Sequence, residues 1–168
     1  LDILKKIKIK KQHNLDKDSV INKYNLGKKQ IDLIDNYIHK LKISNQIHNL
    51  VGPSTIDVAW DRHINDSLQL SEFILKKNAS IIDLGTGAGL PGVILHIFGY
   101  TNILLIDSKM KKINFIKEFA YENGFEIKTI CTRVEKIKNQ KFDVIVCRAF
   151  APLIKLLDYS RFFNKKNT

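Results

Sequence analysis

IIDLGTGAGLPG, residues 81–92, is the stretch that decides the fold. It predicts a short buried strand that ends in a glycine-rich turn, with a helix beginning directly afterwards. Glycine allows the backbone to approach a ligand closely, and the helix presents its N-terminal amides at the same place. Because many nucleotide and cofactor sites share this arrangement, the stretch predicts a ligand site and leaves the ligand open.

Short apolar runs also occur further along the chain, at 103–106, 127–131 and 144–146. Helix-like stretches separate them, and a further helix at 151–162 follows the last run. Another stretch has a helical apolar stripe, and Asn123-Gly124 can end this helix as a C-cap. The stripe consists of Met110, Ile113, Ile116, Phe119 and Ala120. Apolar strands that alternate with helices are typical of a parallel sheet covered on both faces. We therefore expect a doubly wound α/β sheet in residues 79–168.

The first 78 residues have a different pattern. Apolar residues three and four apart predict an amphipathic helix at 28–43, and Gly52-Pro53-Ser54-Thr55 breaks it. A second helical stretch follows, with six side chains available to its apolar side: Val58, Ala59, His63, Leu68, Leu70 and Ile74. We expect residues 1–78 to form a basic, helical N-terminal extension that packs on the sheet.

The composition favours a soluble protein of a reducing compartment. Mean hydropathy is −0.16, and no apolar run approaches the roughly 20 residues that a membrane span needs. The N-terminus has no apolar stretch of signal-peptide length. The two cysteines, Cys131 and Cys147, lack the spacing of a zinc site or a disulfide framework. We expect a cytoplasmic protein without a metal ion.

The net charge of +11 has two explanations. A pI near 9.6 is typical of proteins that bind nucleic acid. However, all but four of the 28 basic residues are lysine, and a chain rich in Lys, Ile and Asn also arises from an AT-rich coding sequence. The composition alone leaves both explanations open.

Two carboxylates narrow the choice of ligand. Asp83 stands two positions before Gly85, where we expect its side chain to face the crevice. A negative charge there attracts a cationic amino-acid tail and repels a pyrophosphate, which favours S-adenosylmethionine over a dinucleotide. Asp107 ends the next strand, 18 positions beyond Gly89. It can accept hydrogen bonds from ribose hydroxyls, or it can cap the helix that starts near Lys109.

A cation is expected beside the glycine turn. Arg148 ends the strand at 144–146, which neighbours the turn in the usual strand order. It can contact a phosphate, a cofactor carboxylate or a guanine oxygen. Three further residues are expected to be structural: His63 hydrogen-bonded between helix and sheet, Cys147 as a small filler, and Trp60 in packing.

Five segments carry a resemblance to a known family: RHINDSLQL (62–70), IIDLGTGAGLPG (81–92), LLIDSKMKKINFIKE (104–118), TRVEKI (132–137) and FDVIVCRAFAPL (142–153). In this order they resemble the bacterial small-subunit ribosomal RNA methyltransferase G family, formerly called glucose-inhibited division protein B. The GLPG run and the CRAFA stretch are much more specific than the glycine spacing. Ser44 stands where relatives have a tryptophan.

The resemblance implies a class I S-adenosylmethionine-dependent methyltransferase, a Rossmann-like doubly wound parallel sheet with an N-terminal helical extension. It implies methylation of guanine N7 in small-subunit (16S) ribosomal RNA. Carried over by position, the implied cofactor contacts are Gly85, Leu90, Asp107, Val134, Glu135 and Arg148. Because guanine N7 has a free lone pair, no general base is required, and Asp66 and Arg148 are the candidates for steering the base.

Two other interpretations stay open. Class I sheets normally add three more strands after the helix predicted at 151–162. We therefore expect the chain to be truncated, with strand 142–147 as an exposed, aggregation-prone edge. A truncated, inactive relative that only binds RNA is therefore one alternative. An NAD(P)-binding oxidoreductase is another, which Asp83 disfavours. The expected partner is small-subunit ribosomal RNA or a pre-ribosomal particle, bound by a monomer.

Overall fold

A four-stranded parallel sheet lies at the centre of the computed structural model, which describes residues 15–163. Its strands are β1 (Ile81–Leu84), β2 (Ile103–Asp107), β3 (Lys128–Cys131) and β4 (Val144–Cys147), in the order β3-β2-β1-β4. All four predicted strands are confirmed. The strand order reverses between β1 and β4, and in open parallel sheets ligands bind outside the carboxyl ends of the strands at such a point.

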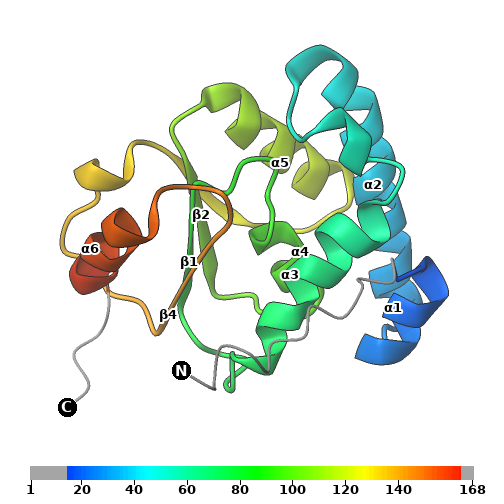
Figure 1. The fold of residues 1–168 in the computed structure, drawn as a ribbon, viewed down its shortest axis with the longest axis horizontal. Helices are drawn as coiled ribbons and strands as arrows, with labels where there is room; N and C mark the ends of the chain where they lie inside the picture. Colours follow the sequence, from blue (N-terminus) through cyan, green and yellow to red (C-terminus); the bar gives the residue numbers. More distant parts are fainter. Residues whose placement is uncertain (1–14, 164–168) are drawn as a thin grey trace, which may run out of the picture.

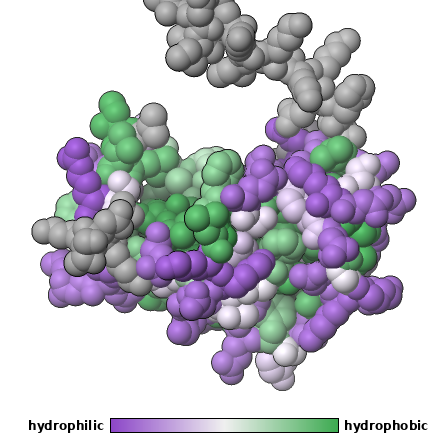
Figure 2. Space-filling view, turned by 90° about the horizontal axis from the view of Figure 1, so that it is seen from below, coloured by the Kyte–Doolittle hydropathy of each residue, from purple (hydrophilic) through white to green (hydrophobic). Residues whose placement is uncertain are grey.

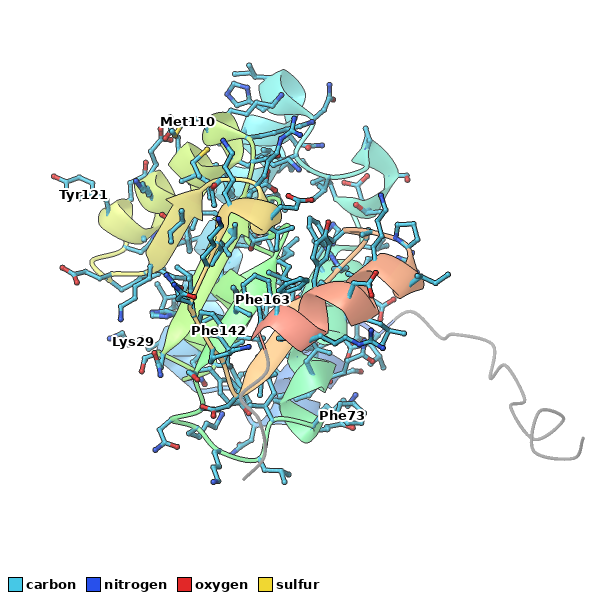
Figure 3. The ribbon with its side chains drawn as sticks, turned by 90° about the vertical axis from the view of Figure 1, so that its left-hand side faces the viewer. Lys29, Phe73, Met110, Tyr121, Phe142 and Phe163 are labelled. Atoms are coloured by element: carbon cyan, nitrogen blue, oxygen red, sulfur yellow. The ribbon has the colours of Figure 1, made fainter. Side chains whose placement is uncertain are left out.

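Helices cover both faces of the sheet, as predicted. Helices α4 (Gly92–Ile97) and α5 (Met110–Glu122) lie on one side of it, and α6 (Leu153–Phe163) lies on the other (Figure 1). Helix α5 ends at the predicted cap, since Asn123 donates back to Ala120 and Gly124 has a φ of 69°. The predicted apolar stripe is wrong for Met110. This residue opens the helix and is 57% exposed, outside the packed stripe (Figure 3).

Two apolar clusters result from the alternation of side chains along each strand. Ile81 and Leu105 point into the larger cluster, toward α4 and α5. The smaller cluster lies on the α6 face and contains Ile82, Leu84, Ile106, Val134 and Phe163. Phe163 also anchors the C-terminal end of α6. Its carbonyl accepts from the Phe142 amide at 2.8 Å, and the two rings lie close together (Figure 3).

The N-terminal part is helical, with two differences from the prediction. Helices α1 (Lys17–Tyr24) and α2 (Lys28–His48) come first, and α2 runs five residues beyond the predicted end. The predicted break contains a short helix, η2 (Pro53–Thr55). The second stretch comprises three short helices: a π-helix η3 (Trp60–Asn65), α3 (Asp66–Leu68) and η4 (Gln69–Glu72). Val58 precedes η3 and is exposed, so its predicted place on the apolar side is wrong. Residues 1–14 of the predicted extension lie outside the described residues.

The N-terminal helices form a layer in which α2 packs on α4 and α5, and α3 packs on α4 (Figure 1). Ile64 and Leu68 of this layer belong to the same apolar cluster as the strand residues Ile81 and Val146. Tyr37 of α2 is fully buried, and its ring packs edge-on against Phe119 at 5.3 Å between centroids. Its hydroxyl donates to the Ala88 carbonyl at 2.9 Å. The helical layer therefore contacts the glycine-rich turn directly, through Tyr37.

Strand β4 is the edge of the sheet among the described residues, as its place in the expected order predicts. Beside it, α6 turns apolar side chains outward: Ile154, Leu157 and Phe162 are all more than half exposed. Figure 2 shows apolar surface gathered in the half of the molecule that contains α6 and β4. No helix within residues 15–163 has the length and apolar character needed to cross a membrane.

Candidate functional site

The glycine loop, residues 85–91, connects β1 to α4 and depends on glycine at three positions. Gly85, Gly87 and Gly89 have φ angles of 69°, 61° and 96°, a region that side-chain-bearing residues rarely adopt. At Gly85 space is also a constraint, because a Cβ atom there would lie 2.1 Å from Cδ2 of Phe150. The Phe150 ring thus lies directly on the loop, at the carboxyl end of β4.

Asp83 lies beneath the glycine loop and does not face the crevice, so that prediction is wrong. Its side chain is fully buried. Oδ2 accepts from the Thr86 hydroxyl at 2.6 Å and from the Gly92 amide at 2.9 Å, which ties the two ends of the loop together. Oδ1 has no hydrogen-bond partner among the described residues. Burial raises the pKa of Asp83 to about 6.

Asp107 ends β2 and holds the outer side of the same loop. One carboxylate oxygen accepts from the Gly87 amide at 3.0 Å, and the other accepts from the Lys109 amide at 2.9 Å. The ammonium of Lys112 lies 3.7 Å from Oδ2. Helix α5 begins at Met110 without a side-chain cap at Lys109, so Asp107 tightens the turn before the helix and is not its N-cap.

Two cavities adjoin the glycine loop. The larger has a volume of about 520 Å³ and lies between the loop and the helical layer. Among the predicted site residues it is lined by Asp66, Gly85, Leu90 and Arg148. The smaller, about 370 Å³, is lined by the remaining ones, Asp107, Val134 and Glu135, and again by Gly85. The structure therefore brings all the predicted site residues around one loop, in two groups that meet at Gly85.

Val134 and Glu135 belong to the short helix η5 (Val134–Lys136), which follows β3. Val134 is buried in the α6-side cluster. The Glu135 carboxylate accepts from the Tyr159 hydroxyl at 2.7 Å, a hydrogen bond that lowers the pKa of Glu135. Helix α6 thus fixes one wall of the smaller cavity.

Arg148 directly follows β4, where the end of this strand meets the helical layer. Its Nη1 is 3.2 Å from the Arg62 carbonyl, 3.2 Å from Nδ1 of His63 and 3.3 Å from Oδ2 of Asp66. Burial and the neighbouring Arg148 charge lower the pKa of His63 to about 4, so the ring is neutral at neutral pH. His63 is hydrogen-bonded at a junction, as predicted. Trp60 lies outside both cavities, as does Cys147, whose thiol pKa is raised by burial.

Sequence reasoning missed two residues of the site. Lys112 lines both cavities from the first turn of α5, and Phe150 lines the smaller one. A signal for Lys112 was available, because it follows Asp107 by little more than one helical turn. Phe150 gave none, since its position depends on Ala149, which has a left-handed φ of 49°. Within residues 15–163 no cluster of His, Cys, Asp and Glu is arranged to hold a metal ion.

Comparison with known proteins agrees with this geometry. The family model of rRNA small subunit methyltransferase G matches residues 30–168. Ribosomal RNA small subunit methyltransferase G of Orientia tsutsugamushi (strain Ikeda) is 35% identical over 144 residues, which cover 86% of this chain and 72% of that protein. The protein of the same name from Rickettsia prowazekii (strain Madrid E) is 35% identical over 131 residues, covering 78% and 68%.

Two solved structures share the fold. A mutant of MtNAS in complex with S-adenosylmethionine has a TM-score of 0.51 at 14% identity, covering 90% of this chain and 65% of that one. The YcgJ protein from Bacillus subtilis has a TM-score of 0.50 at 21% identity, covering 60% and 47%. At such low identity these likenesses concern the fold alone. The match over residues 30–168 and the identity to the two relatives show that this chain belongs to the rRNA small subunit methyltransferase G family.

Proposed function

We propose that this chain transfers a methyl group from S-adenosylmethionine to N7 of a guanine in 16S ribosomal RNA, as a monomer in the cytoplasm. Family membership supports methyl transfer to small-subunit ribosomal RNA. The observation that carries the proposal is the pair of cavities joined at Gly85. Arg148 lines the larger cavity and Asp107 lines the smaller one, and the glycine loop borders both.

The smaller cavity suits the adenosine end of the cofactor. Each oxygen of the Asp107 carboxylate accepts one backbone amide. A carboxylate oxygen has two lone pairs, so one on each oxygen remains for a ribose hydroxyl. The two amides also fix the direction of the carboxylate before any ligand arrives. Val134 and Glu135 would then lie along the base.

The larger cavity suits the amino-acid end of the cofactor and the target base. Arg148 supplies positive charge for the cofactor's carboxylate. Asp83 supplies negative charge beneath the loop, and although it does not touch the cavity, its field in a poorly hydrated interior favours the cationic sulfonium and ammonium groups. Asp66 is the candidate for steering the guanine, with Arg148.

S-adenosylmethionine, when bound, supplies an electrophilic methyl group. The attacking N7 lone pair of guanine is free, so no proton has to be removed before or during the attack. The residues of this chain therefore need only hold the base in line with the methyl group and exclude water. His63 is neutral and its ring is hydrogen-bonded to structural partners on both sides, so it is not a base in this reaction.

The positive charge supports an RNA substrate. The chain has a net charge of +11, and phosphate contacts made by lysine give salt-dependent affinity. The charge would attract naked RNA and a ribosomal particle alike. No observation favours the truncated, RNA-binding remnant or the NAD(P)-binding oxidoreductase.

A labelling experiment tests the proposal. The chain is incubated with S-adenosylmethionine labelled at the methyl group and with small ribosomal subunits, or their naked 16S RNA, from a strain that lacks this modification. We expect 7-methylguanosine in a nuclease digest, at one position, and none with Arg148→Ala. Label on an exocyclic amine or on ribose would overturn the N7 assignment. Binding of NAD but not of S-adenosylhomocysteine would overturn the whole proposal.

A further inference from the structure

A chain of hydrogen bonds runs from Arg148 into the helical layer. The donor is Nη1 of Arg148, 3.2 Å from Nδ1 of His63. On the other side of the ring, Nε2 of His63 lies 2.9 Å from the Thr55 hydroxyl, which in turn donates to the Gly52 carbonyl at 2.7 Å. These hydrogen bonds join the end of β4 to the break after α2, two segments more than 80 residues apart in sequence.

The chemistry of arginine fixes the direction of every bond in this chain. A guanidinium only donates, so Nδ1 of His63 must accept. The single ring proton is therefore on Nε2 and is donated to the Thr55 oxygen, while the Thr55 proton goes to Gly52. His63 is buried, with 4% of its surface exposed, and its ring is held from both sides.

The contacts leave one edge of the Arg148 guanidinium unused. The Arg62 carbonyl, His63 and Asp66 are all contacted by Nη1. Nε and Nη2 make no hydrogen bond with any residue from 15 to 163, and Arg148 lines the larger cavity. The Nε–Nη2 edge is the flat two-pronged side of arginine, which matches a carboxylate with two parallel hydrogen bonds.

Resting on the proposed function, we propose that His63 is a positioning residue for the cofactor. By accepting from Nη1, it turns the Nε–Nη2 edge of Arg148 toward the larger cavity, where that edge binds the carboxylate of the amino-acid moiety of the methyl donor. A carboxylate is favoured over an RNA phosphate because Gly85 and Leu90, at the glycine loop, line the same cavity. Asp66 also contacts Nη1 but holds it less firmly, since its side chain is nearly half exposed. The Arg62 carbonyl also accepts from Nη1, and this contact remains in every His63 variant.

Two substitutions separate the two sides of the ring. The Oδ1 atom of asparagine can take the place of Nδ1, so His63→Asn keeps the acceptor for Arg148 and loses Thr55. Glutamine places its amide where Nε2 was, so His63→Gln keeps Thr55 and loses the acceptor. The ligands are S-adenosylhomocysteine, which has the carboxylate, and 5′-methylthioadenosine, which lacks the whole amino-acid moiety. Affinities of the full chain are measured by calorimetry, with urea unfolding as a check on the fold.

We expect His63→Gln to bind S-adenosylhomocysteine about tenfold more weakly than the parent, the loss typical of one hydrogen bond to a charged group. His63→Asn should stay within about threefold, and both variants should bind 5′-methylthioadenosine as the parent does. A nitrogen-15 spectrum of the parent should show the Nε2–H form of His63, and Thr55→Val should cause a smaller loss than His63→Gln.

Each other outcome overturns a distinct claim. Equal losses for both variants, or a loss for 5′-methylthioadenosine as large as for S-adenosylhomocysteine, would mean that His63 only supports the packing. Unchanged cofactor affinity with a raised KM for RNA in His63→Gln would assign the free edge of Arg148 to a phosphate. A parent that binds neither ligand would refute the proposed function itself.

Discussion

The buried carboxyl of Asp83 makes a quantitative test of the site possible through Asp83→Asn. The side chain is fully buried, Oδ1 has no partner among the described residues, and Oδ2 accepts from Thr86 and Gly92. Burial raises the pKa from its ordinary value of 3.8 to about 6. In the folded protein this carboxyl therefore keeps its proton over a pH range in which the unfolded chain has lost it.

The sign of the effect follows from proton counting. As pH rises from 3.8 to about 6, the unfolded chain releases this proton first, so the stability of the folded protein falls, and the loss is complete above about pH 6. A shift of this size corresponds to about 3 kcal/mol. Asparagine is neutral at every pH and its Oδ1 can still accept from Thr86 and Gly92. The difference in free energy of unfolding between the variant and the parent should therefore rise by about 3 kcal/mol, in favour of the variant, as pH increases from about 4 to 7.

His63 makes the comparison with the variant necessary. Burial and the Arg148 charge lower its pKa to about 4, so the unfolded chain takes up a proton first as pH falls. His63 therefore makes the parent more stable as pH rises, which is opposite in sign to the effect of Asp83. The stability curve of the parent contains both effects. The difference between variant and parent contains only that of Asp83.

Urea unfolding followed by the fluorescence of Trp60, the single tryptophan, gives the free energies at about pH 4, 5, 6 and 7. Asp57→Asn is the matched control, because it makes the same chemical change at a side chain that is 85% exposed. Parallel curves for Asp83→Asn and the parent would refute the reasoning, since they would mean that Asp83 is as ionised in the folded protein as in the unfolded chain.

Three further predictions concern the ligands. Gly85→Val should abolish binding of S-adenosylhomocysteine while the chain still unfolds cooperatively, because φ is 69° and a Cβ would meet Phe150 at 2.1 Å; equal calorimetric affinity would sink the site assignment. Asp107→Ala should weaken the cofactor by about 1.5–3 kcal/mol, and Asp107→Asn by less. Because Asp107 also accepts from the Gly87 and Lys109 amides, Asp107→Ala should destabilise the fold as well. A change in cofactor affinity below a few tenths of a kcal/mol would mean that Asp107 only holds these two amides and does not bind the ribose. RNA affinity should fall steeply with salt; a flat response would mean that the lysine content reflects coding composition alone.

Strands β1, β2 and β4 could be predicted from the sequence because each is a short, mostly apolar run bounded by polar residues or glycine. Strand β3 has the weaker signal, since it begins with Lys128 and Thr129. By contrast, Ile103–Asp107 of β2 is buried or half-buried throughout. The glycine loop was equally predictable, since positive φ angles at Gly85, Gly87 and Gly89 require the residue type that is present. Both features are determined by local sequence.

The direction of the Asp83 side chain was not predictable from its place before the loop. A strand residue points to one face or the other, and which face accepts a carboxylate depends on the room left by the next helix. Here that room comes from Gly92, where a Cβ would lie 2.7 Å from Oδ2 of Asp83. The last glycine of the GLPG run was therefore a signal for a buried carboxylate, and the amide of Gly92 is its donor.

The contact between His63 and Arg148 was also out of reach. Helical periodicity at 3.6 residues per turn describes an α-helix, but residues 60–65 form a π-helix, which is wider and rare in proteins. The common contact of the Arg62 carbonyl, His63 and Asp66 with one guanidinium shows that this segment turns all three toward β4. The pairing joins residues 85 positions apart, a separation that no local pattern encodes.

The site is a joint product of the helical layer and the sheet. The change of pattern near residue 78 marks where helices give way to strands, but the packing crosses it: Tyr37 holds the Ala88 carbonyl, and the Tyr100 hydroxyl donates to Ile74 at 3.0 Å. The sheet supplies the glycine loop and Asp107, while the layer supplies the groups that orient Arg148. Loosening the layer would therefore misdirect Arg148, the cation that lines the larger cavity at the end of β4, so cofactor affinity depends on residues that need not touch the cofactor.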